Sequence, residues 1–90
     1  GDFDFIKELF ELYKQNFDEK KSLLETAITT KHEKNSILYS HEFKGSSGNI
    51  GAEAAKKISE RIEKACREGK FDLAETLLGE WRETIEATWE

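Results

Sequence analysis

Apolar residues recur at intervals of three and four positions in separate parts of this chain. The most regular series lies near the C-terminus and consists of Ala74, Leu77, Leu78, Trp81, Ile85, Thr88 and Trp89. Neighbours on one face of an α-helix are three and four residues apart, so this spacing predicts an amphipathic helix. Each such helix has to bury its apolar stripe against another, which restricts the chain to a helical bundle.

Breaks in the pattern divide the chain into four expected helices. Gly48, Gly51 and Gly69 fall at these breaks, as expected from the preference for glycine at helix C-termini. The stripe of the first helix consists of Ile6, Phe10, Tyr13, Phe17, Leu24 and Ile28. The helices are expected at about residues 3–28, 33–48, 52–68 and 71–90. Short connections between amphipathic helices predict an all-α fold, an antiparallel up-down four-helix bundle that forms a single domain over residues 1–90.

Composition narrows the possible functions. The chain has 90 residues, contains no proline and carries a formal net charge of -5. Lysine and arginine alternate with glutamate instead of forming a basic stripe, which argues against nucleic-acid binding. No apolar run approaches the roughly 20 residues that a membrane span requires. We therefore expect a monomeric, cytoplasmic domain that acts without nucleic acid or membrane.

The second expected helix has two different faces. One face carries Ser36, Ser40, Phe43 and Ser47 and is expected to point into the bundle. The opposite face carries His41, Gly45 and Gly48, and Lys44 follows the histidine by three residues. Residues three apart are neighbours on a helix surface, so Lys44 places a cation beside the imidazole. This arrangement suits an imidazole that will carry an anion, with Gly45 leaving space for it.

Ile37 and Leu38 lie one turn before His41 and are expected to flank the histidine face. Apolar residues that have no partner inside the molecule often mark a docking site. Together with Gly45 and Gly48, which leave room for an approaching partner, they form what we call the docking strip. A glycine in the middle of a helix costs about 1 kcal/mol relative to alanine, so Gly45 needs a reason in packing or function.

Other kinds of site are disfavoured by the sequence. His32 and His41 are nine residues apart, which suits no usual metal site, so no metal is expected in this chain. The glycine-rich stretch 45–51 follows a helix and lacks the spacing of a phosphate-binding loop, so no nucleotide cofactor is expected either. A serine nucleophile at Ser46 or Ser47 would need an activating base, and the sequence offers none.

The run His41-Glu42-Phe43-Lys44-Gly45-Ser46-Ser47, with its continuation Gly48-Asn49-Ile50-Gly51-Ala52, resembles the signature of histidine phosphotransfer (HPt) domains. The resemblance extends over essentially the whole chain. It implies a two-component phosphorelay intermediate in which His41 is the phosphoacceptor and Lys44 supports the phosphoryl group. It also implies that Gly45 and Gly48 leave space for the partner. This sequence departs from the family at two positions, since members often carry an acid near His32 and alanine where Ser40 stands. Both departures affect helix capping and packing.

The resemblance implies that the phosphoryl group comes from the aspartyl phosphate of a receiver domain, in a response regulator or a hybrid histidine kinase. It also implies that the transfer is reversible and that the domain passes the phosphoryl group on to a second receiver. The chain has no ATP site of its own, and the receiver is expected to provide Mg²⁺. The alternative is the dimerisation and phosphoacceptor region of a sensor histidine kinase, in which Glu42 would act as the base. The sequence does not decide which group orients the His41 imidazole.

Overall fold

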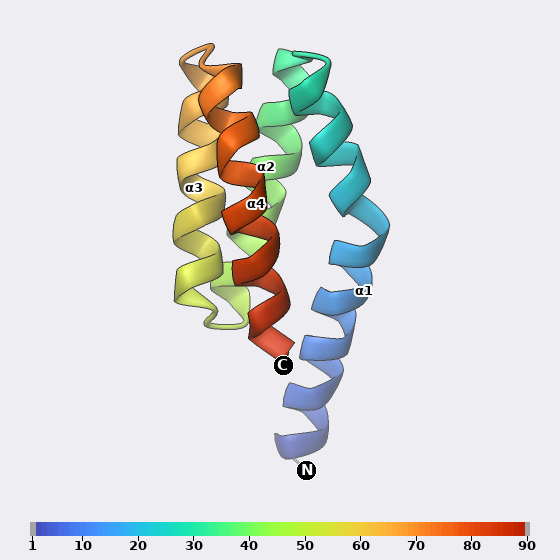
Figure 1. The fold of residues 1–90 in the computed structure, drawn as a ribbon. Coiled ribbons are helices and arrows are strands. Elements are labelled where there is room, and N and C mark those ends of the chain that lie inside the picture. Colours follow the sequence, from blue (N-terminus) through green and yellow to red (C-terminus); the bar gives the residue numbers. More distant parts are fainter. Residues whose placement is uncertain (1, 90) are drawn as a thin grey trace.

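The computed structural model describes residues 2–89, and over this range it is a bundle of four α-helices. The helices are α1 (Asp2–Thr29), α2 (Glu33–Asn49), α3 (Glu53–Arg67) and α4 (Phe71–Glu86), followed by the short 3-10 helix η1 (Ala87–Trp89). Consecutive helices run in opposite directions (Figure 1). α2 packs between α1 and α3, and α4 closes the bundle against α3 and α1. The predicted all-α four-helix bundle is confirmed.

The first helix differs from the prediction at its N-terminal end. α1 is one continuous helix over Asp2–Thr29. Its first turns extend beyond the ends of the other helices (Figure 1). Ile6, expected in the core, is therefore 50% exposed and Phe10 is only half-buried. Their spacing is that of the core stripe, but no helix lies opposite them to cover it.

Aromatic side chains from three helices form the centre of the core. Phe17 of α1, Phe43 of α2 and Trp81 of α4 are fully or almost fully buried. The Trp81 ring centroid lies 5.2 Å from that of Phe17 and 5.1 Å from that of Phe43, within the range of favourable aromatic pairs. The indole Nε1 of Trp81 donates a hydrogen bond of 3.2 Å to Ser59 Oγ on α3, so all four helices meet here.

Small polar side chains line the inner face of α2, as the sequence predicted. Ser36, Ser40 and Ser47 are fully buried on the same side as Phe43. Small residues allow the helix axes to approach closely. Ser40 Oγ donates to the carbonyl oxygen of Ser36 at 2.6 Å, and Ser47 Oγ lies 2.8 Å from the Tyr13 hydroxyl on α1. These bonds supply partners for polar atoms that would otherwise be costly to bury.

The ends of α2 are fixed by specific residues. His32 precedes the helix, and its Nδ1 accepts a hydrogen bond of 3.2 Å from the backbone N–H of Asn35. The imidazole thus caps α2 in place of the acidic or hydroxyl side chain that is usual at a helix N-terminus. At the other end Gly51 adopts a φ of 73°, a left-handed conformation that glycine tolerates best. Both caps hold the helix that carries His41.

Candidate functional site

His41 lies on the outer face of α2, as the helical pattern predicted. Its side chain is 64% exposed. Gly45 and Gly48, one and two turns further along, are exposed on the same side. A Cβ atom added at Gly45 would meet no atom within 4 Å, so no packing contact within residues 2–89 requires glycine there. The imidazole therefore lies next to an exposed surface, formed by Gly45 and Gly48, that carries no side chains.

The imidazole is held by a carboxylate on the neighbouring helix. His41 Nδ1 lies 3.2 Å from Oε1 and 3.3 Å from Oε2 of Glu63 on α3. A carboxylate can only accept hydrogen bonds, so this contact places the proton of a neutral imidazole on Nδ1. The lone pair is then on Nε2, the other ring nitrogen. Glu63 is the group that orients the ring, which the sequence left undecided.

Glu63 is itself fixed in place by a second charge. Its side chain is only 9% exposed. Arg67, one turn later on α3, donates from Nε and from a terminal nitrogen to Glu63 Oε2, each at 2.9 Å. A charged group this deeply buried is costly unless it is paired, and Arg67 supplies the pair. Arg67 contacts only Oε2, whereas His41 Nδ1 lies within hydrogen-bond distance of both carboxylate oxygens.

Lys44 also faces α3. Its Nζ lies 3.8 Å from Oε2 of Glu60, and its side chain is 32% exposed. Two acids of α3, Glu60 and Glu63, thus contact the lysine and the histidine of α2. The pair between Lys44 and Glu60 is long and mostly exposed, so it holds the lysine weakly.

The docking strip is partly exposed. Leu38 is 46% exposed, whereas Ile37 is half-buried and packs against the core instead of pointing freely to solvent. Beside the strip, a groove of about 420 Å³ separates α1 from α2. Its lining includes Leu12 of α1 and Ser46 of α2, which directly follows Gly45. A partner that covered the strip would also border this groove.

Cys66 lies one turn after Glu63 but on the buried side of α3. It is fully buried. Burial raises the pKa of its thiol to about 11. The thiol therefore stays protonated near neutral pH and is a poor nucleophile. Cys66 is therefore a small residue of the core.

We also searched the described residues for a metal site and for a membrane-spanning helix. Within residues 2–89, no group of three or more histidine, cysteine, aspartate or glutamate side chains could hold a metal ion. None of the helices over the same range is long and apolar enough to cross a membrane.

A four-helix bundle with an exposed histidine in this motif is the arrangement of a histidine phosphotransfer domain. The family model described as "Hpt domain" matches residues 8–90, and the chain therefore belongs to this family. Over 86 residues it is 33% identical to a protein named phosphorelay intermediate protein rdeA from Dictyostelium discoideum. The match covers 96% of this chain and 34% of that protein, so the chain spans about a third of its relative's length. No solved structure gave a significant match.

Proposed function

We propose that this chain is a phosphorelay intermediate that carries the phosphoryl group on Nε2 of His41. It accepts the group from the aspartyl phosphate of one receiver domain and passes it to another. The receivers belong to response regulators or hybrid histidine kinases, and the domain acts as a cytoplasmic monomer. The observation that carries the proposal is the exposed imidazole of His41 held through Nδ1 by the buried carboxylate of Glu63.

In the forward step, the Nε2 lone pair of His41 attacks the phosphorus atom of the aspartyl phosphate. A nitrogen–phosphorus bond forms, the phosphorus–oxygen bond to the aspartate breaks, and the aspartate leaves as a carboxylate. The imidazole gains positive charge as it attacks. Glu63, which accepts the Nδ1 proton in a hydrogen bond, stabilises that charge. The reverse step uses the same atoms.

The phosphoryl group also needs positive charge around it during transfer. In this chain Lys44 is the cation on the same face of α2, one helical turn from His41. We propose that the receiver supplies the remaining charge as Mg²⁺ held by its own carboxylates. The domain then acts as a shaped reactant without an ATP site, and the receiver provides much of the catalysis.

The alternative, a histidine kinase dimerisation region, is less well supported. In that interpretation Glu42 would act as the base for His41. Glu42 instead lies 3.5 Å from Lys20 Nζ on α1, and the acid that contacts His41 is Glu63 on α3. A single chain also completes the four-helix bundle, which such a region would form by dimerisation.

Incubation with a phosphorylated receiver tests the proposal. The chain should acquire label that is lost in acid and stable in base, which is the behaviour of a phosphorus–nitrogen bond. With γ-labelled ATP and no partner, the purified chain should remain unlabelled. Labelling from ATP alone would revive the kinase alternative. A lack of label from every receiver tried and from phosphoramidate would reject phosphoryl acceptance.

Glu63→Gln should slow transfer from a receiver about tenfold, because a charge-assisted hydrogen bond is roughly twice as strong as a neutral one. The glutamine oxygen can still accept the Nδ1 proton but no longer stabilises the charge on the ring. Single-turnover transfer measures the rate, and ¹⁵N spectra of the imidazole report which nitrogen carries the proton. Glu53→Gln, which changes an exposed acid of the same helix, is the matched control. Identical rates and identical ¹⁵N spectra in the Glu63 variant would remove its positioning role.

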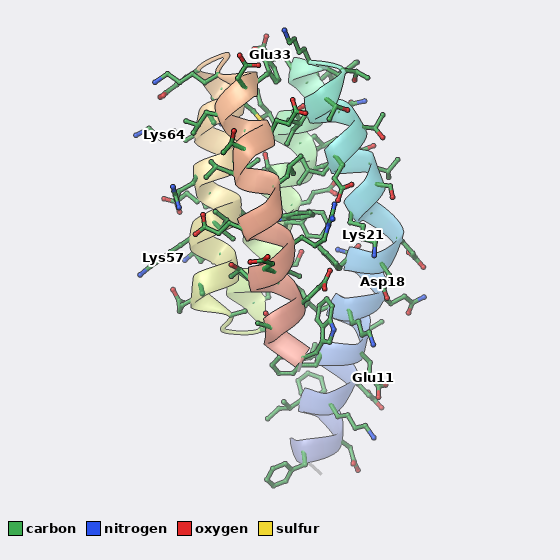
Figure 2. The ribbon with its side chains drawn as sticks, viewed as in Figure 1. Glu11, Asp18, Lys21, Glu33, Lys57 and Lys64 are labelled. Atoms are coloured by element: carbon green, nitrogen blue, oxygen red, sulfur yellow. The ribbon has the colours of Figure 1, made fainter. Side chains whose placement is uncertain are left out.

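Lys44→Ala should lower the transfer rate about threefold to tenfold at low salt, the range expected for a partly exposed charge. It should also shorten the lifetime of the phosphohistidine. Both effects should shrink as salt is added, because the site is open to solvent. Lys64→Ala is the control, since Lys64 points outward from α3 (Figure 2). If the two variants had the same kinetics at low salt, Lys44 would have no part in transfer.

A further inference from the structure

The side chain of a lysine from the neighbouring helix lies beside Gly48, which is itself exposed. A Cβ atom added at Gly48 would lie 3.5 Å from Cδ and 3.8 Å from Cε of Lys56. Lys56 stands in the first turn of α3 and is half-buried. Its aliphatic stem therefore crosses from α3 onto the outer face of α2. A Cβ at Gly48 would make only ordinary van der Waals contact with this stem, so the stem borders the outer face of α2 and does not fill the place of a side chain.

The charge of Lys56 is not compensated within the described part of the chain. Lys20, Lys44 and Arg67 pair with Glu42, Glu60 and Glu63 respectively. Lys56, like the exposed Lys57 and Lys64, has no ion pair or side-chain hydrogen bond to any residue in the range 2–89, but unlike them it is half-buried. Half-buried methylene groups restrict its stem, so little conformational freedom remains to be lost on binding. Lys56 is an ammonium group held in place without an anion.

Lys56 lies over the same face that presents His41. Gly48 follows His41 by seven residues, which corresponds to about two helical turns or roughly 10 Å along the axis. Lys44 lies closer in sequence, at one turn, and is the cation suited to the phosphoryl group itself. Lys56 lies beside Gly48, two turns from His41. At this distance its ammonium group can contact the surface of the protein that delivers the phosphoryl group.

We propose that Lys56 binds a surface carboxylate of the docked receiver and so orients the receiver on His41. This inference rests on the proposed function. The receiver that it implies needs carboxylates to hold Mg²⁺ and carries an aspartyl phosphate, so it approaches with negative charge. An unpaired ammonium at the edge of the contact raises the rate of productive encounter with such a partner. Lys56 is a recognition residue, and the chemical step does not pass through it.

Lys56→Met tests the proposal because it keeps the stem over Gly48 and removes the charge. Lys57→Met is the matched control: it makes the same charge change at the next residue, whose side chain points outward from α3 (Figure 2). The measured quantity is the second-order rate constant for transfer from a phosphorylated receiver at low and physiological salt. Lys56→Met should lower it on the order of fivefold at low salt, and the loss should shrink at higher salt. Lys57→Met should remain within about twofold of the wild type.

Labelling by phosphoramidate separates the possible outcomes, because this small donor needs no docking surface. Lys56→Met should be labelled at the wild-type rate. A slower rate with phosphoramidate would mean that Lys56 acts on the phosphoryl group, and equal rates for both lysine variants with the receiver would mean that it has no recognition role. Either result overturns the inference. If the wild-type chain took label from neither donor, the proposed function itself would fail instead. Circular-dichroism melting of both variants confirms that the bundle is intact.

Discussion

His41→Gln should fold like the wild type and carry no phosphoryl group after incubation with a phosphorylated receiver. Glutamine has no nitrogen lone pair that can attack phosphorus, so acceptance should fall to background. The stability of the bundle should change by less than about 1 kcal/mol, since the imidazole is 64% exposed and Glu63 keeps its contact with Arg67. Label retained on the gel measures acceptance, and thermal unfolding measures stability.

His32→Gln provides a control for the loss of a histidine, because His32 caps α2 and lies outside the site. This variant should accept label normally and unfold at a slightly lower temperature, as expected when a cap is weakened. Label on the His41 variant would show that another residue is the acceptor. An unfolded His41 variant would instead show that this histidine is needed for the fold.

Gly45→Glu should block transfer from a receiver, by about a hundredfold or more, and leave labelling by phosphoramidate nearly unchanged. The position is open, so the new side chain fits the isolated domain and projects from the face that the receiver must cover. It obstructs the contact and places negative charge opposite a partner that is itself negative, a juxtaposition that costs several kcal/mol. Stopped-flow or quenched-flow transfer from a labelled receiver measures the effect.

Gly45→Ala separates obstruction from a change in the helix. Alanine should stabilise α2 by about 0.5–1 kcal/mol, because glycine is unfavourable inside a helix. Its single methyl group should slow transfer far less than glutamate does. Leu38→Glu, on the same exposed strip, should resemble Gly45→Glu. Normal transfer by both glutamate variants would place the receiver elsewhere on the bundle.

Helical periodicity predicted most of the fold because each helix buries one stripe. The sequence also separated the two faces of α2, since Phe43 and three serines mark the inner face and His41 lies opposite. It could not show that α1 extends beyond the bundle. Ile6 and Phe10 continue the spacing of the core residues, and only the lengths of the other helices decide whether anything covers them.

The site was predictable within α2 and not across helices. His41 and Lys44 are neighbours on one helix, and local spacing is sufficient to bring them together. Glu63 comes from α3, and its approach to His41 depends on how the two helices pack. A signal was nevertheless present: Glu63 directly follows Ile62 and lies three residues before Cys66, so a charged residue stands beside the apolar stripe of α3. Lys56 gave no such signal, because its contact with the outer face of α2 depends on how α2 and α3 pack.

The contact between His41 and Glu63 joins two helices that are separate in an unfolded chain. An unfolded or partly synthesised chain contains the whole motif around His41. It lacks the contact with Glu63 that sets the tautomer of the imidazole in the folded domain. Such a chain would be a poor phosphoryl acceptor, even though its imidazole is fully accessible. In the proposed relay, the packing of α3 against α2 is therefore a condition for efficient phosphoryl acceptance.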